Sequence, residues 1–222
     1  MQELLNIEST YVSVIDKQTD IVFICFNGLT GTDIDGVHPF QLTEFKSVSK
    51  LYTTIFIVDK TMSWGNHVDW DMVKTAIQPV VERKTTISLG LSMGGFNAIV
   101  SSSTLNVDKV ISFNAQYSIH KLISPSQEYD SYANKIKYWK FKTFDYSFTN
   151  NTKYYMFVSE GSEVDKLAIS KYPDFCHVFN FGDKYEHNIP AVLKQEKRMQ
   201  DLFDLVIADD LNKITEYVDK VI

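Results

Sequence analysis

The residues Gly90-Leu91-Ser92-Met93-Gly94 form a G-x-S-x-G motif, a pattern that places a serine nucleophile on a sharp turn. An apolar run precedes the motif and a helix-like pattern follows it, as that role requires. Side chains two residues before and after the serine would clash with the turning backbone, so glycine is favoured there. The following helix would direct its N-terminal N–H groups at developing negative charge. The alternative is a glycine-rich turn that binds phosphate or merely packs tightly.

A serine nucleophile needs partners elsewhere in the chain. The hydroxyl requires a general base within hydrogen-bond reach, and the base requires a group that orients it. Five histidines are available, and several acidic residues lie between the motif and the last of them. The elements that could bring such residues together therefore decide whether Ser92 can react.

Continuous apolar runs alternate with helix-like periodic segments along the chain. Such runs suit strands buried on both faces, and their alternation with helices predicts a mostly parallel sheet with helices on both faces. We expect a helix over 69–84, with Asp69 as its N-cap and a bend at Pro79, a second over 93–103, and helical structure from 188 onwards. The expected strands are 21–28, 53–60, 85–91, 109–115, 153–159 and 176–181, with an edge strand at 10–15.

The segment 116–152 is too long for a simple connection between two elements. It is rich in aromatic residues and lysines, and we expect a small helical insert or cap over one end of the sheet. We find no repeat, low-complexity tract or linker, so the pattern favours one α/β domain over 1–222 with a cap-like insertion at about 116–152.

Composition excludes several classes of function. The chain has 222 residues, 44% hydrophobic and 23% charged, with a formal net charge of −6, and no Lys/Arg cluster points to nucleic acid. No segment has the length and apolarity of a membrane span, and the N-terminus lacks a secretory signal, so we expect a cytoplasmic protein. Cys25 and Cys176 lie in apolar runs and are expected to be small buried residues. No metal-ligand spacing and no dinucleotide fingerprint occurs, so no metal and no cofactor are expected.

The run "LSMGGFNAI" after the third apolar run, the order of the elements and a late histidine resemble the α/β-hydrolase family, roughly over 21–206. The run is close to the S-M-G-G-x-x-A pattern of many esterase-like members. The wider layout, "FNG…VDKTMSW…GLSMGGFNAI…ISFNAQYSI…HNIPAVLK", also resembles a bacterial subgroup associated with polysaccharide biosynthesis. The resemblance implies a serine esterase with a Ser-Asp-His triad in the chain order Ser, acid, His.

That order favours His187 as the base. His187 directly follows the last expected strand and precedes the last helical region, where the family places its base. His38 and His67 precede the serine, His120 comes before any plausible acid, and His177 starts an apolar run. The alternative for His187 is a surface histidine at a helix N-terminus.

The acid should follow the strand at 153–159. Asp165 is favoured because it immediately precedes the apparent helix "KLAIS", where it could also be an N-cap. Glu163 and Glu160 remain open alternatives, since the spacing from Gly161 departs from the pattern of the family.

The resemblance also implies an oxyanion hole made of two backbone N–H groups. One belongs to Met93, directly after the nucleophile. The other is expected at Leu29, with Gly28 as the alternative, in a loop where Asn27 replaces the usual histidine. Trp64, in the loop after the second long strand, could bind substrate or could simply pack.

These residues predict acyl transfer through a serine ester. The expected substrate is a small-molecule or saccharide ester, such as a carbohydrate O-acyl ester. An acyltransferase would use the same triad, and a non-catalytic binding protein of the same fold is the other alternative. Aromatic residues and lysines in 116–152 could stack on sugars and attract an acidic polymer, or bury a small lid with its lysines in water. The oligomeric state stays open.

Overall fold

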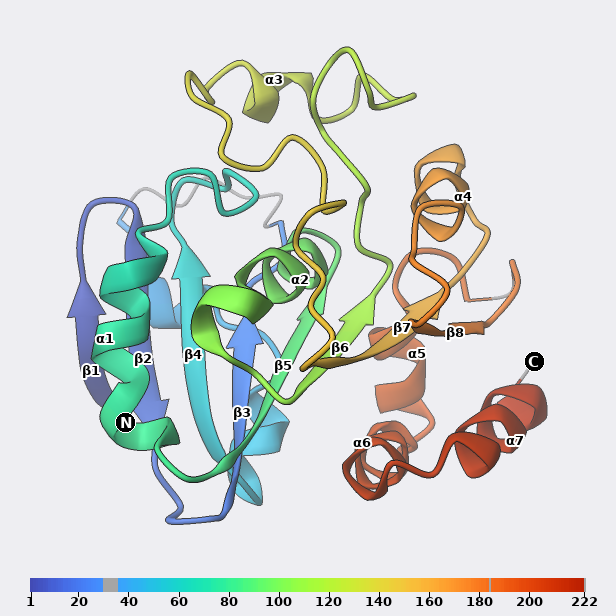
Figure 1. Ribbon diagram of the computed structural model, residues 1–222, viewed down its shortest axis with the longest axis horizontal. Coiled ribbons are helices and arrows are strands. Elements are labelled where there is room, and N and C mark those ends of the chain that lie inside the picture. Colours follow the sequence, from blue (N-terminus) through green and yellow to red (C-terminus); the bar gives the residue numbers. More distant parts are fainter. Residues whose placement is uncertain (30–35, 184, 222) are drawn as a thin grey trace.

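A mixed, mostly parallel sheet runs through the molecule in the strand order β1-β2-β4-β3-β5-β6-β7-β8 (Figure 1). The computed structural model describes residues 1–29, 36–183 and 185–221. Within these residues the strands are β1 (Gln2–Asn6), β2 (Thr10–Ile15), β3 (Ile21–Phe26), β4 (Thr53–Asp59), β5 (Thr85–Leu91), β6 (Lys109–Phe113), β7 (Lys153–Val158) and β8 (His177–Asn180).

The parallel part of the sheet creates the edge on which the site is built. β2 runs antiparallel to both β1 and β4, whereas the strands from β4 through β3, β5, β6 and β7 to β8 run parallel to one another. The loops after the parallel strands therefore meet at one edge, and such an edge is where ligands bind in open α/β sheets.

The sequence expectation for the strands was right except at the N-terminal side. β2 lies inside the sheet and is not an edge strand, because β1 pairs with its outer side. β1 was missed because its residues "QELLN" neither alternate cleanly nor form an apolar run, and none of them is fully buried. An outer strand pairs with a neighbour on one side only and needs little apolar surface. Its residues therefore show no hydrophobic pattern from which a strand could be predicted.

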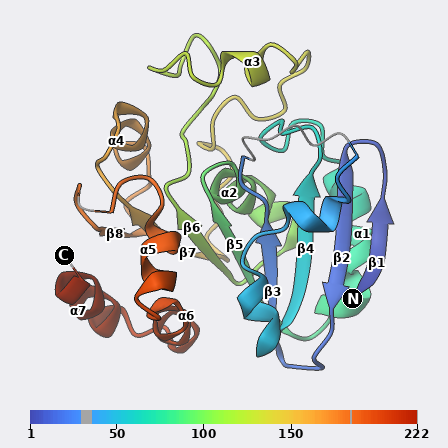
Figure 2. The ribbon, with the colours of Figure 1, turned by 180° about the vertical axis from the view of Figure 1, so that it is seen from behind.

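Helices cover both faces of the sheet (Figures 1 and 2). α1 and α2 pack on one face, and the elements η1, η2, α5, α6 and α7 lie on the other, where Figure 2 brings them forward. The helices are η1 (Pro39–Leu42), η2 (Lys46–Lys50), α1 (Trp70–Val81), α2 (Met93–Leu105), α3 (Asp130–Ala133), α4 (Glu163–Ile169), α5 (Ile189–Gln195), α6 (Met199–Ala208) and α7 (Leu211–Val221).

Two helix expectations can be compared in detail. Asp69 caps α1 as predicted, accepting a hydrogen bond of 3.0 Å from the Met72 N–H, and Pro79 lies inside the helix. The helical region after 188 is three helices and not one, because Lys197 and Asp209 adopt left-handed backbone conformations, with φ of 59° and 60°, between them. Residues in the left-handed conformation commonly end helices, and glycine is the usual residue there. Neither of these two positions is glycine, so the sequence carried no sign of the helix ends.

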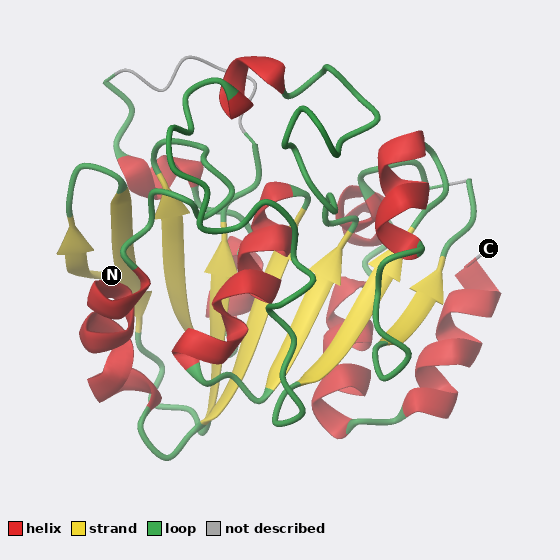
Figure 3. Ribbon diagram, turned by 45° about the horizontal axis from the view of Figure 1, so that its top comes forward, coloured by secondary structure: helices red, strands yellow, loops and turns green. Residues whose placement is uncertain are grey.

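Most of the segment 116–152 lies beyond the carboxyl ends of the central strands, as Figure 3 shows at the top of the view, and its last residues return to the start of β7. Its helical content is lower than expected, since α3 is only four residues long and most of the segment is irregular. Phe144 is fully buried and its ring lies 6.3 Å from that of Phe96 in α2, so aromatic packing ties the segment to the domain. Tyr138 and Tyr146 are exposed.

Two smaller expectations concern cysteine and membranes. Cys25 and Cys176 are both buried and free, as the apolar runs around them predicted. Across the described residues, every helix is too short or too polar to cross a bilayer.

Candidate active site

Ser92 lies between β5 and α2 in a backbone conformation that is strained for serine, with φ of 58° and ψ of −121°. Non-glycine residues in such regions persist only where the surroundings hold them, and they cluster at functional sites. Here the Ser92 N–H donates to the Phe113 carbonyl at 2.9 Å, and the Ser92 carbonyl accepts from Phe96 at 2.9 Å. The turn is thus fastened to β6 on one side and to α2 on the other.

The two motif glycines are required by close backbone contacts. A Cβ at Gly90 would lie 2.2 Å from the carbonyl carbon and oxygen of Gly94, and a Cβ at Gly94 would lie 2.9 Å from the backbone oxygens of Phe26 and Asn27. No side chain fits at either distance without moving backbone. The clash that the motif implied is therefore real, and it also brings the start of α2 against the end of β3.

Asp165, in the first turn of α4, and His187, in the loop after β8, come together at this edge of the sheet. The His187 Nδ1 lies 3.1 Å from Asp165 Oδ1 and 3.4 Å from Oδ2. Asp165 is only 2% exposed, whereas His187 is partly exposed. A buried carboxylate that bonds Nδ1 fixes the ring and leaves Nε2 free, which is how a catalytic histidine is oriented.

The other two acid candidates do not contact His187. Glu163 is exposed and pairs with Lys166 at 3.0 Å, and Glu160 accepts a hydrogen bond of 2.6 Å from Asn180. Asp165 is not the N-cap that the sequence suggested, because α4 begins two residues earlier and Ser162 caps it, accepting from the Asp165 N–H at 3.2 Å. The Ser162 hydroxyl in turn donates to Asp165 Oδ2 at 2.7 Å. The cap thus holds the carboxylate that faces the histidine.

Asn114 fastens the loop that carries His187, a role that sequence reasoning missed. It directly follows β6, is buried, and has a φ of 38°. Its Nδ2 donates to the His187 carbonyl at 2.8 Å, and its Oδ1 accepts from the Ser159 N–H at 2.8 Å. The only sequence signal was a polar residue at the end of an apolar strand, within "ISFNAQYS".

Gln116 was also missed, although it contacts the nucleophile. Its Nε2 lies 2.5 Å from Ser92 Oγ, and its side chain is fully buried. Within the described part of the chain, Ser92 Oγ bonds to Gln116 and not to His187. Hydrogen bonds between nucleophile and base are often long in unliganded sites and tighten when substrate binds.

Trp64 is held behind Gln116 by a tightly bonded loop. Its ring is 1% exposed and its Nε1 donates to Gln116 Oε1 at 3.2 Å, so here it reaches the nucleophile only through Gln116. Direct substrate binding by Trp64 stays a prediction. Buried Asp59 accepts from the backbone N–H groups of Ser63 at 2.8 Å and Gly65 at 3.1 Å, which flank Trp64. These bonds fix the loop and with it the position of the indole.

The oxyanion donors proposed from sequence are the N–H group of Met93, at the start of α2, and that of Leu29, in the loop after β3. Met93 opens α2, and the first N–H groups of a helix have no acceptor within the helix. The backbone N–H of Gly28 already bonds the Glu44 carboxyl, which favours its neighbour Leu29 as the second donor. The contacts of the Leu29 N–H with the residues that follow, 30–35, lie outside the described residues. Both donors stay predictions.

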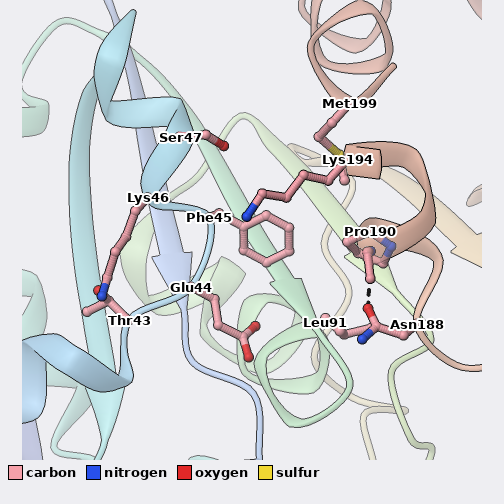
Figure 4. Close-up of a pocket in the computed structure, with 11 residues that line it drawn as sticks. Thr43, Glu44, Phe45, Lys46, Ser47, Leu91, Asn188, Pro190, Lys194 and Met199 are labelled. Atoms are coloured by element: carbon pink, nitrogen blue, oxygen red, sulfur yellow. Dashed lines mark hydrogen bonds between the residues drawn. The ribbon is translucent and has the colours of Figure 1, made fainter. Parts of the chain in front are cut away.

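A cavity of about 370 Å³ opens beside these residues, between the chain at 43–47 and helix α5 (Figure 4). Leu91 and Asn188, the neighbours of Ser92 and His187 in the chain, both line it. Glu44, Phe45 and Lys194 project into it from the two sides. Burial raises the pKa of the Glu44 carboxyl to about 7, more than the bond from Gly28 lowers it.

Phe45 adopts a left-handed conformation with φ of 55°, which is unusual for a bulky residue. Its ring stacks on that of Phe113 at the end of β6, with the centroids 6.2 Å apart. The aromatic ring of Phe45 thus lines the same cavity as Leu91, the residue before the serine.

The remaining histidines have other partners. His38 caps η1, His67 bonds Thr61, His120 lies edge-on to Trp139, and His177 is in β8 as its apolar surroundings predicted. None of these contacts involves Ser92 or Asp165.

Comparison with known proteins gives matches by structure alone. No protein-family model matches this chain, and no curated protein sequence does. The chain is similar to the capsule O-acetyltransferase of Neisseria meningitidis serogroup A, at a TM-score of 0.57 and 14% identity, over 89% of this chain and 94% of that one. It is similar to an α/β superfamily hydrolase from Oenococcus oeni, at a TM-score of 0.54 and 15% identity, over 96% and 100%.

A third similar structure is a chain of a glycosylation-associated protein complex from Streptococcus agalactiae, at a TM-score of 0.60 and 16% identity. The match covers 92% of this chain and 46% of that one, so it concerns about half of the larger chain. Identities this low support the architecture and nothing finer. Together with the parallel sheet and its helices on both faces, they show that this chain has the α/β-hydrolase fold.

Proposed function

We propose that this protein transfers an acyl group through a covalent ester on Ser92, with His187 as general base and Asp165 as the residue that orients it. The observation that carries the proposal is the Asp165–His187 pair, 3.1 Å apart, at the edge of the sheet that also carries the strained serine turn. Serine acyl transfer needs such an arrangement, in which an aspartate orients a histidine and the histidine serves a serine on a nucleophile turn.

The proposed reaction has two steps. In the first, the Ser92 hydroxyl proton passes to His187 Nε2, Oγ forms a bond to the ester carbonyl carbon, and the carbonyl electron pair moves onto oxygen. The N–H groups of Met93 and Leu29 stabilise that oxyanion. The tetrahedral species collapses, and the alcohol leaves with the proton from His187. In the second step water or another alcohol attacks the acyl-enzyme in the same way and releases the acyl group.

The cavity beside Ser92 is the proposed site for the alcohol part of the substrate. Phe45 offers an aromatic face, and Lys46 and Lys194 line the same cavity. Aromatic faces with charged groups suit saccharides, and one similar structure is a capsule O-acetyltransferase. A carbohydrate O-acyl ester is therefore the proposed substrate class. The cytoplasm stays the expected compartment.

An acyltransferase is the second candidate, because a sugar alcohol in that cavity could replace water as the acceptor. A non-catalytic binding protein is the rival from another class. The missing Ser92–His187 bond would favour it, whereas the buried acid behind the histidine speaks for catalysis. The two readings make opposite predictions for chemical labelling.

The test uses a fluorophosphonate probe, followed by a panel of short acyl esters and acetylated sugars with and without an acceptor alcohol. We expect the probe to label Ser92, and Ser92→Ala to lose both labelling and turnover. Product formed only when an acceptor is present would identify a transferase. Equal labelling of wild type and Ser92→Ala would refute the proposal.

A further inference from the structure

Gln116 hydrogen-bonds the hydroxyl of the proposed nucleophile. It follows β6, its side chain is fully buried, and its Nε2 lies 2.5 Å from Ser92 Oγ. The N–H and C=O groups of a buried amide are expected to be hydrogen-bonded, because an unpaired buried polar group costs free energy. The question is which end of the amide faces the serine.

Trp64 answers that question. An indole N–H can only donate, so it must face the oxygen of an amide. Trp64 Nε1 lies 3.2 Å from Gln116 Oε1, and Trp64 is itself 1% exposed. The amide therefore presents its NH₂ group to Ser92, and the reverse orientation would set N–H against N–H at Trp64.

The insertion encloses the amide from the other side, where a tyrosine hydroxyl can accept from the NH₂ group. The hydroxyl of Tyr129 lies 3.4 Å from Gln116 Nε2, and the Tyr129 ring packs edge-on against Trp64 with centroids 5.5 Å apart. Trp64 also contacts the ring of Tyr132, 5.9 Å away. Gln116 is thus enclosed by Trp64, from the loop after β4, and by Tyr129, from further along the segment 116–152.

An NH₂ group aimed at Ser92 Oγ makes that oxygen an acceptor. The hydroxyl proton of Ser92 then remains available for His187. As that proton leaves, negative charge builds on Oγ, and a donor that is already in place in a dry site stabilises it without reorganisation.

We propose that Gln116 is a catalytic residue that stabilises negative charge on Ser92 Oγ, with Trp64 as the residue that positions it. The proposal rests on the acyl transfer proposed above. In acylation the Oγ–H bond breaks, the proton passes to His187 and the Oγ–carbon bond forms. In deacylation that bond breaks, Oγ receives the bonding pair, and the proton returns to it from His187. The Gln116 N–H donates to Oγ in both steps, because both pass through a charged Oγ.

The main variant is Gln116→Met, which keeps the length of the side chain and removes both amide groups. We expect kcat for an activated ester to fall roughly 10²- to 10³-fold, as for the loss of one preorganised donor, with little change in KM. The rate of fluorophosphonate labelling at Ser92 should fall in parallel. Gln116→Asn should not restore the rate, since its shorter side chain cannot reach both partners.

Trp64→Phe tests the positioning role, because it keeps an aromatic ring and removes the N–H. In the wild-type background kcat should fall about tenfold, and in the Gln116→Met background it should have no further effect. A merely structural role would make the two effects multiply. Tyr132→Phe, which keeps the ring that touches Trp64, is the matched control and should turn over like wild type.

The outcomes are separable from those of the proposed function. Gln116→Met with wild-type labelling and turnover overturns this inference, while loss of labelling in Ser92→Ala leaves acyl transfer standing. No labelling of the wild type overturns both. If Gln116→Met does not fold, Trp64→Phe decides: a fall in kcat without a change in KM supports the inference, and an unchanged kcat overturns it.

Discussion

His187 Nδ1 lies 3.1 Å from Asp165 Oδ1, although 22 positions separate the two residues in the chain. The contact forms because the loops after β7 and β8 meet at one edge of the sheet, where a Cβ on Gly161 would come within 3.2 Å of the Glu186 Cα. Ser162 and Asn114 hold the two partners from behind.

Asp165→Asn should abolish most turnover while leaving the fold intact. An amide can present its NH₂ to Nδ1 and favour the wrong tautomer of His187, so we expect kcat to fall by about 10³- to 10⁴-fold. Steady-state kinetics with an activated ester measures it. Glu163→Gln, which removes an exposed carboxylate paired with Lys166, is the control and should be neutral. The reverse result, with Glu163→Gln inactive and Asp165→Asn active, would show that the acid is misassigned.

Gly90→Ala should destabilise the protein and stop labelling of Ser92. The added Cβ meets the Gly94 backbone at 2.2 Å, so the turn must open, at a cost of about 2–4 kcal/mol. Thermal unfolding and probe labelling measure the two effects. Gly182→Ala is the matched control: its φ is 67° but nothing lies within 4 Å of the new Cβ, so it should cost only about 1 kcal/mol. A folded and reactive Gly90→Ala protein would contradict the packing of the turn.

Glu44 should give activity an alkaline limit. Burial raises its pKa from an ordinary value of 4.5 to about 7, so the carboxyl is neutral below pH 7 and charged above it. Its bond to Gly28 places that charge beside the proposed oxyanion loop, where it would repel the oxyanion. We expect kcat to decline as pH rises through about 7, and Glu44→Gln to remove that decline. A pH–rate profile of both proteins decides, and an identical decline in the variant would exclude Glu44 as its source.

The same carboxyl should make stability depend on pH. Because its pKa is higher in the folded than in the unfolded protein, the folded state binds more protons between pH 4.5 and about 7. The contribution of Glu44 to stability therefore falls as pH rises across that window and is level above it. The difference in Tm between Glu44→Gln and wild type should grow in favour of the variant from pH 5 to pH 8, as calorimetry can measure. A constant difference would refute the buried, neutral carboxyl.

Asp59→Asn should loosen the loop that holds Trp64. Oδ2 of the carboxylate accepts from the N–H groups of Ser63 and Gly65, and Oδ1 accepts from that of Thr61, so an amide would set its NH₂ group against one of these two sets of donors. We expect a loss of about 2–4 kcal/mol in unfolding free energy and a lower kcat. Asp69→Asn, at the N-cap of α1, is the control, since Asn caps helices as well as Asp does. Equal stability of the two variants would contradict the role of Asp59.

Much of the fold could be read from the chain because its signals are local. Buried parallel strands need apolar residues on both faces, and the runs around β3, β4 and β5 supply them. β1 and the breaks at Lys197 and Asp209 were missed, because a partly exposed outer strand and left-handed non-glycine residues leave no such pattern.

The sequence by itself determined the serine turn, since the clash that requires Gly90 is with the backbone of Gly94, within five consecutive residues, whereas Gly94 meets the end of β3 only in the folded protein. Through the order of serine, acid and histidine that the family resemblance implies, it also predicted His187 as the base and left three candidates for the acid. Only the tertiary structure decided that Asp165, and not Glu163, faces His187, that Gln116 reaches Ser92, and that Glu44 lies against Gly28. The physical reason is that each of these contacts joins segments that are separate in the chain, and its geometry depends on how the strands, helices and loops pack.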